Sequence, residues 1–174
     1  MDFTIRGIIW QDFHDIINNY YSYFKELNSQ RDFGIIFPHE KPEITEEIEW
    51  FSSLYKDVQT GNAIAVVAQY DNKVVGLCDI RRKGPNSELD HIGILGITVR
   101  REFRGTGIGK ALLKDALQRN KGVFEIVLLD VFSTNQIAIN LYKKLGFKEY
   151  GYLKNAVKRG NEYIDEIKMY YNVE

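Results

Sequence analysis

Hydrophobic residues recur along the first half of the chain with the periods of strands and amphipathic helices. Residues 2–9 alternate roughly and predict a strand. Residues 11–27 place hydrophobic side chains at i, i+3, i+4 and i+7, the spacing of an amphipathic helix. We expect residues 28–42 to form a loop, and a second helix to begin with Thr45 as its N-cap and to run to about Val58.

The second half of the chain predicts a longer series of elements. In chain order they are strands at 63–70, 73–82 and 90–99, a helix after the glycine turn, a strand at 123–132, a helix that starts at Ser133-Thr134-Asn135 and has Gly146 as its C-cap, and strands at 148–156 and 162–171. Asp71-Asn72 is the hairpin turn between the first two strands. The mostly apolar run at 90–99 is typical of a central strand. The predicted order is β-α-α-β-β-β-α-β-α-β-β, a mixed α/β layer.

Composition and charge limit the classes of function. The 174 residues suit one domain, 1–174, with a sizeable core. The formal net charge of −1 gives no basic field for a nucleic acid or a membrane surface. Cys78 is the single cysteine and lies in an apolar run, so we expect a buried thiol and a reducing, cytoplasmic setting. No signal peptide, long apolar run or metal-ligand spacing is expected.

A glycine-rich turn joins the strand at 90–99 to the helix that follows it. Gly105, Gly107 and Gly109 stand at alternate positions, and Arg104 lies on the same turn. Glycine lets the backbone bend and lets a ligand approach closely. The N-terminus of the helix behind the turn offers unsatisfied N–H groups and a partial positive charge. This combination predicts an anion site, with phosphate as the favoured ligand.

Two common phosphate motifs do not fit this turn. In a P-loop, Gly-x-x-x-x-Gly-Lys-[Ser/Thr], Arg104 would replace the first glycine and Ala111 the magnesium-binding hydroxyl. In the dinucleotide motif Gly-x-Gly-x-x-Gly, the last glycine would fall on Lys110 or Leu112. The pattern that remains is Arg-x-x-Gly-x-Gly.

A second motif lies at residues 135–147, which read Asn-Gln-Ile-Ala-Ile-Asn-Leu-Tyr-Lys-Lys-Leu-Gly-Phe. It is similar to Asn-x-x-Ala-x-x-Leu-Tyr-x-x-x-Gly-Phe. The two motifs, in this order, resemble the GNAT superfamily of acyl-CoA-dependent N-acetyltransferases, and the element order agrees over essentially the whole chain. The resemblance implies a mixed, mostly antiparallel sheet of about seven strands with about four helices. It also implies a central parallel strand pair that splays apart at a bulge near the end of the strand before the glycine turn.

The resemblance further implies acetyl-CoA as co-substrate, held in the wedge between the splayed strands. Its pantetheine arm would pair with strand backbone at 97–99, and its pyrophosphate would accept N–H groups from 104–110. The residues assigned to acetyl-CoA in this way are Ile97, Thr98, Val99, Arg104, Gly105, Thr106, Gly107, Ile108, Gly109, Lys110, Asn135, Tyr142 and Lys144.

Acetyl transfer to an amine needs a neutral amine, donors for the oxyanion and a proton for the leaving thiolate. Tyr142 matches the proton donor of the family, and its alternative is a core tyrosine with a satisfied hydroxyl. Asp130, twelve residues earlier, matches the position of a catalytic glutamate in some members, although a shorter side chain favours a water relay. If the bulge exists, a backbone N–H near Val99 is the expected oxyanion donor. Other carboxylates or bases considered are Glu88, Asp90, His91, Asp165 and Glu166.

We therefore expect an N-acetyltransferase that acts by direct attack through a tetrahedral intermediate. The acceptor would be the primary amine of a polyamine, an amino acid or a related small molecule, or a protein N-terminus. The alternative is a non-catalytic CoA-binding sensor or partner-binding module on the same fold. The resemblance also allows a homodimer.

Overall fold

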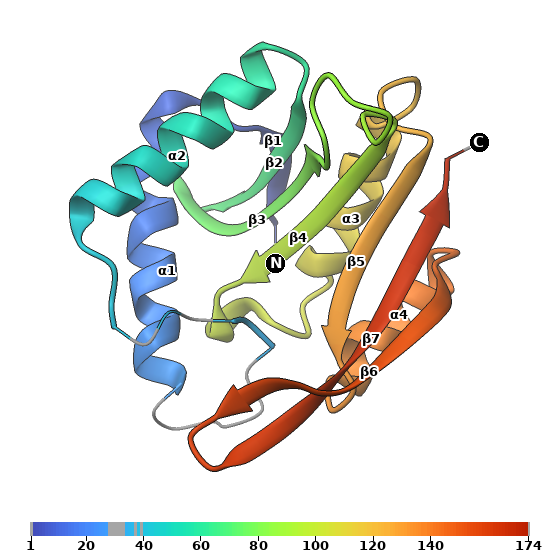
Figure 1. Ribbon diagram of the computed structural model, residues 1–174. Coiled ribbons are helices and arrows are strands. Elements are labelled where there is room, and N and C mark those ends of the chain that lie inside the picture. The colour runs from blue at the N-terminus through green and yellow to red at the C-terminus, as the bar shows by residue number, and fades with distance from the viewer. Residues whose placement is uncertain (1, 28–33, 37, 39, 174) are drawn as a thin grey trace.

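The computed structural model describes residues 2–27, 34–36, 38 and 40–173 (Figure 1). The loop expected at 28–42 thus lies partly outside the described residues. The elements are β1 (Thr4–Gly7), α1 (Phe13–Leu27), α2 (Ile44–Gln59), β2 (Ala63–Tyr70), β3 (Lys73–Arg82), β4 (Ile92–Val99), α3 (Ile108–Arg119), β5 (Ile126–Phe132), α4 (Gln136–Lys144), β6 (Lys148–Arg159) and β7 (Glu162–Asn172), with short 3-10 helices at Trp10–Asp12 and Arg101–Phe103. The predicted element order is confirmed.

The seven strands form one sheet in the order β1-β2-β3-β4-β5-β7-β6. All neighbouring pairs are antiparallel except β4 and β5, which are parallel. This confirms the expected fold class. Among the helices in the described ranges, none is long and apolar enough to cross a membrane.

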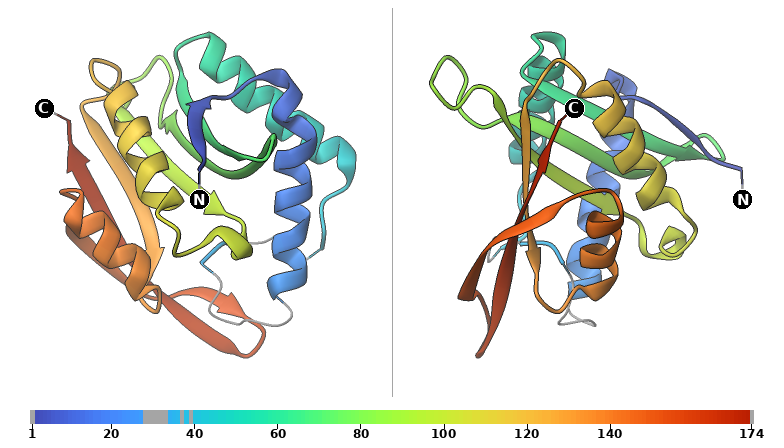
Figure 2. Two further views of the ribbon diagram at one scale, coloured as in Figure 1. Left: turned by 180° about the vertical axis from the view of Figure 1, so that it is seen from behind. Right: turned by 90° about the vertical axis from the view of Figure 1, so that its right-hand side faces the viewer.

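Helices cover both faces of this sheet, so the described residues form two hydrophobic cores, one on each face (Figure 2). Side chains alternate between the faces along each strand. On β2, Ala65 and Val67 pack with α1 and α2, whereas Val66 and Ala68 face α3. The larger core continues past α3 to α4 and the C-terminal strands.

The parallel strands β4 and β5 stay together over only three residue pairs, the last of which is Ile94 with Leu128. Beyond that pair they diverge into a wedge, which Figure 1 shows between their arrowheads. The expectation of a bulge near the end of β4 is wrong, because β4 keeps an unbroken register with β3 as far as Val99. Past this point β5 remains paired with β7 up to Phe132 while β4 remains paired with β3, so each strand follows a different neighbour.

Local hydrogen bonds explain where element ends differ from expectation. Thr45 is not the N-cap of α2, because the N–H of Glu43 donates to the carboxylate of Glu46 at 2.8 Å and the helix begins at Ile44. The strand expected from residue 123 begins later, at Ile126. The preceding residues close a turn in which the N–H of Val123 donates to the carbonyl of Asn120 at 2.9 Å. The hairpin turn at Asp71-Asn72 is confirmed, with φ of 48° and 58°.

Replacing Gly107 by alanine is expected to lower the free energy of unfolding by about 1–2 kcal/mol, since an L side chain at φ +93° is strained. A Cβ there would have nothing within 4 Å, so the loss reports backbone conformation alone. The matched control is Gly109→Ala, inside α3. Its Cβ would lie 3.9 Å from Val99 and 4.0 Å from Leu141, and stability should hold or rise by about 1 kcal/mol. Urea denaturation measures both, and equal losses would contradict this account.

Candidate functional site

The edge of β4 that faces the wedge offers backbone groups to a ligand. Hydrogen bonds alternate along an antiparallel pair, and the N–H of Arg100 donates to Val75 at 2.9 Å on the β3 side. By that alternation Ile97 and Val99 direct their N–H and C=O groups toward the wedge, whereas Thr98 pairs with Leu77 of β3. Of the three residues expected to bind pantetheine through their backbone, Thr98 therefore faces the other way.

The glycine turn forms an open cradle at the N-terminus of α3. Gly105 has φ +76° and Gly107, the N-cap, has φ +93°, with nothing within 4 Å of a Cβ at either position. Ile108 is fully buried and fixes the helix start against the core. The first N–H groups of a helix have no intrahelical partner, so those of residues 107–110 remain to hold an anion. The hydroxyl of Thr106 donates to the carbonyl of Phe103 at 2.6 Å.

The side chain of Arg104 ties this turn to its neighbours. Its Nε donates to the carbonyl of Val99 at 2.9 Å, and its two terminal nitrogens donate to the carboxylate of Glu26 on α1 at 2.9 and 3.3 Å. Its own N–H donates to Arg101 at 3.2 Å. Arg104 therefore lies beside the cradle as a brace. The N–H of Arg104 is thus already engaged within the turn.

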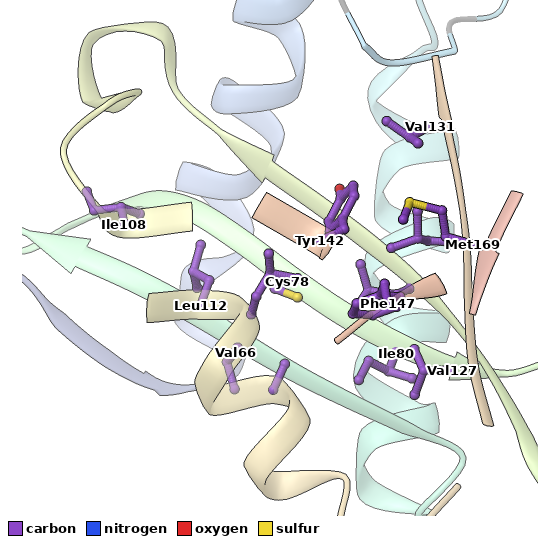
Figure 3. Close-up of a cluster of buried hydrophobic side chains, with 14 of the residues drawn as sticks. Val66, Cys78, Ile80, Ile108, Leu112, Val127, Val131, Tyr142, Phe147 and Met169 are labelled. Carbon is purple, nitrogen blue, oxygen red and sulfur yellow. The ribbon is translucent and has the colours of Figure 1, made fainter. Parts of the chain in front are cut away.

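The second motif places Asn135 and Tyr142 on α4. Asn135 is the N-cap, and its Oδ1 accepts the N–H of Ala138 at 3.2 Å. Tyr142 is 7% exposed and packs in the larger core with Cys78 and Phe147 (Figure 3). Burial, and to a lesser extent Cys78, raises the pKa of Tyr142 well above its ordinary value. Its hydroxyl thus keeps its proton at neutral pH, as a proton donor must.

The remaining predicted residues are exposed. Lys110 lies in the first turn of α3 and Lys144 in the last turn of α4. Asp130 lies on β5 beyond the last β4–β5 pair, and its carboxylate accepts from Lys168 at 3.0 Å. Asp130 thus stands on the β5 side of the wedge with a cationic partner.

The other bases considered lie elsewhere. Asp90 precedes β4 and stands nine residues before Val99, about 30 Å along an extended strand. Glu88 and His91 share this distant end. Asp165 on β7 accepts from the hydroxyl of Tyr152 and from the N–H of Asn155, and the pKa of this carboxyl is lowered as a result. None of these, nor Glu166, lines the cavity described next.

A cavity of about 360 Å³ lies between the N-terminal helices and the sheet, and sequence reasoning missed it. The described residues that line it are Ile16, Tyr20 and Tyr23 of α1, Pro42, Glu46, Glu47 and Trp50 at the start of α2, Leu77 and Asp79 of β3, and Gly96, Ile97 and Thr98 of β4. Its floor is therefore the part of β4 that has left β5. The cavity and the wedge meet at this strand.

Asp79 is the acidic residue nearest the shared strand. A Cβ on Gly96 would lie 3.3 Å from its carboxylate oxygen. Burial raises the pKa of Asp79 to about 7, partly opposed by Arg81. The signal in the sequence was a single carboxylate within the apolar run Val-Val-Gly-Leu-Cys-Asp-Ile. In the described ranges, no three or more His, Cys, Asp or Glu residues gather so as to hold a metal ion.

Comparison with known proteins agrees with this geometry. A family model described as the Acetyltransferase (GNAT) family matches residues 10–147. The chain is 37% identical over 105 residues to an N-alpha-acetyltransferase of Sulfurisphaera tokodaii, covering 55% of this chain and 63% of that protein. It is 31% identical over 108 residues to the L-amino acid N-acetyltransferase AaaT of Escherichia coli, covering 60% and 65%. The matches thus span less than two thirds of either relative.

Solved structures share the fold over the full chain. An N-acetyltransferase from Staphylococcus aureus Mu50 superposes with a TM-score of 0.83 at 20% identity, covering 100% of both chains. A phosphinothricin acetyltransferase from Sinorhizobium meliloti in complex with AcCoA has a TM-score of 0.83 at 21% identity, covering 99% of this chain and 89% of that one. With the family model matching most of its length, this chain belongs to the Acetyltransferase (GNAT) family.

Proposed function

We propose that the chain transfers an acetyl group from acetyl-CoA to a primary amine. The proposal rests on one observation, which is that the wedge and the cavity both border β4. The wedge reaches Ile97 and Val99 from the sheet edge, and the cavity reaches Gly96 and Thr98 from the sheet face. A donor in the wedge and an acceptor in the cavity would be neighbours across a single strand, as direct transfer requires.

The residues around the wedge fit acetyl-CoA. The N–H groups of 107–110 would hold its pyrophosphate, since the turn is open and glycine keeps the backbone accessible. The wedge-facing N–H and C=O of Ile97 would pair with the pantetheine amides, and Lys144 would reach the 3′-phosphate. When bound, acetyl-CoA supplies the thioester carbon that the amine attacks. The Sinorhizobium relative and a Salmonella typhimurium relative, yncA, were solved with this molecule.

Two side chains on opposite faces of the sheet would transfer protons, one from the incoming ammonium and the other to the departing thiolate. Asp79, in the cavity, would accept a proton from the incoming ammonium, and the amine nitrogen would then attack the thioester carbon. As the carbon–sulfur bond breaks, Tyr142 would give its proton to the departing thiolate, and the nitrogen of the new amide would lose its extra proton to water. The N–H of Val99 would stabilise the oxyanion. Asp130 is the second candidate for the proton acceptor, acting through water.

The acceptor is a small primary amine or a protein N-terminus. The names of the Sulfurisphaera and Escherichia relatives point to α-amines of proteins and of amino acids. A cavity of about 360 Å³ suits a small molecule or the first residue of a peptide.

Gly107→Glu is expected to weaken acetyl-CoA binding about 100-fold, because a carboxylate would face the pyrophosphate across the cradle. The matched control is Gly107→Ala, which has the same backbone strain without the charge and should bind within a few-fold of wild type. Titration calorimetry of the folded variants with acetyl-CoA gives both dissociation constants. If Gly107→Glu bound as tightly as Gly107→Ala, the pyrophosphate would not lie at this turn.

Asp79→Asn is expected to lower kcat about 100-fold with any amine that the wild type acetylates. In the wild type, kcat/KM should rise as the pH approaches about 7, because the carboxyl of Asp79 ionises. This rise with pH should be absent in Asp79→Asn. Asp130→Asn is the matched control and should keep both the wild-type kcat and the rise of kcat/KM with pH. The opposite result, with Asp130→Asn inactive and Asp79→Asn active, would assign the proton acceptor to Asp130.

Tyr142→Phe is expected to lower kcat about 100-fold while leaving the Kd for acetyl-CoA unchanged, because the hydroxyl acts only as the thiolate leaves. Tyr171→Phe serves as control, since Tyr171 packs against the same core, with its ring 5.3 Å from that of Phe147. Steady-state release of CoA thiol measures the rates. Equal rates in the two variants would make Tyr142 a core tyrosine only.

A further inference from the structure

The first turn of α2 buries a carboxylate against the cavity. Glu47 is 6% exposed and is one of the residues that line the cavity. Burial, and then the neighbouring Glu46, raises the pKa of Glu47 above its ordinary value. The N-terminus of α2 favours a negative charge here, but it supplies only a partial positive charge.

Two other buried carboxylates have a cationic partner. Asp12 accepts from both terminal nitrogens of Arg6 at 2.8 and 2.7 Å, and Glu26 receives the guanidinium of Arg104. The side-chain carboxylate of Glu47 forms no hydrogen bond or ion pair with any residue in the described ranges, whereas its backbone N–H donates to the carbonyl of Glu43 within the helix. A buried charge without a partner is unfavourable, so a group that is absent from the chain itself would complete this site.

The rest of the lining indicates the kind of group. None of the twelve described residues that line the cavity is basic, whereas three are acidic: Glu46, Glu47 and Asp79. Three aromatic side chains, Tyr20, Tyr23 and Trp50, lie among them. Aromatic faces and carboxylates both attract an ammonium group, and aromatic rings also cover a hydrocarbon stem.

We propose that the acceptor carries a second positive charge, which pairs with Glu47 while the reacting amine lies beside Asp79 and Gly96. This inference rests on the proposed function, because it names the acceptor class of the same site. The class is an aliphatic diamine or longer polyamine. An amino acid acceptor would bring a carboxylate into a cavity whose lining has no cation to receive it.

Three acceptors of equal chain length separate these possibilities: 1,5-diaminopentane, pentylamine with one charge, and L-lysine, the same diamine with a carboxylate. Their binding is measured by titration calorimetry at pH 8 without acetyl-CoA, so that no reaction occurs. The diamine should bind about 30-fold more tightly than either of the other two, as loss of one member of a buried charge pair implies. Equal binding of diamine and monoamine, or tighter binding of L-lysine, would overturn the inference.

Substitutions of acidic residues on α2 test whether Glu47 is the carboxylate that pairs with the second ammonium group. Glu47→Gln should weaken diamine binding about 30-fold and leave pentylamine unchanged. Glu49→Gln, the same change at an exposed residue of α2 outside the cavity lining, should alter neither. Glu47→Asp keeps the charge and should retain most of the diamine preference. An unchanged diamine affinity in folded Glu47→Gln would assign the second charge elsewhere and reject the proposal.

Acetyl transfer is then assayed separately with the same amines. Diamine binding that depends on Glu47, without transfer to any amine, would contradict the proposed function and leave this inference supported. Transfer to pentylamine and the diamine with equal kcat/KM would contradict the inference and leave the proposed function supported.

Discussion

Backbone pairing at the centre of the sheet stops after Ile94 and Leu128, and the site depends on this loss. In a continuous sheet, the N–H and C=O groups of the following residues would be consumed by the neighbouring strand. Here β4 stays with β3 and β5 stays with β7, so a strand edge opens inside the sheet. Such an edge can take an extended amide chain as a further strand would.

The open edge needs rigid flanks, and an ion pair supplies one of them. The guanidinium of Arg104 contacts both the carboxylate of Glu26 and the carbonyl of Val99, so it joins α1, the end of β4 and the glycine turn. A bidentate contact between a guanidinium and a carboxylate fixes the relative orientation of the two groups as well as their distance. The cradle at Gly107 and the edge at Val99 are thereby held in one geometry. The arginine of the motif thus contributes by bracing the site.

Patterns that depend on neighbouring residues could be predicted from the sequence, whereas features set by distant contacts could not. The turn at Asp71-Asn72 and the helix start at Ser133-Thr134-Asn135 are local, and both were predicted. Thr45 was chosen as an N-cap by residue type, but a carboxylate three residues beyond Glu43 moved the helix start. The separation of β4 from β5 occurs without a bulge in β4, while each strand keeps its pairing with its other neighbour, and no local residue pattern marks where it begins.

The cavity could not be predicted from the sequence, because contacts between residues distant in the sequence form it. Its carboxylates are an example. Asp79 and Glu47 lie about thirty residues apart, and only the packing of α2 over β3 and β4 brings both to one space. Asp12 and Glu26 are buried with arginines and contribute to folding. Glu47 is buried without such a partner, which opposes folding. Where a chain retains an arrangement that its own folding disfavours, a ligand is the natural source of compensation. Within the cavity, a buried carboxylate without a partner in the chain is therefore the feature on which the proposed acceptor site rests.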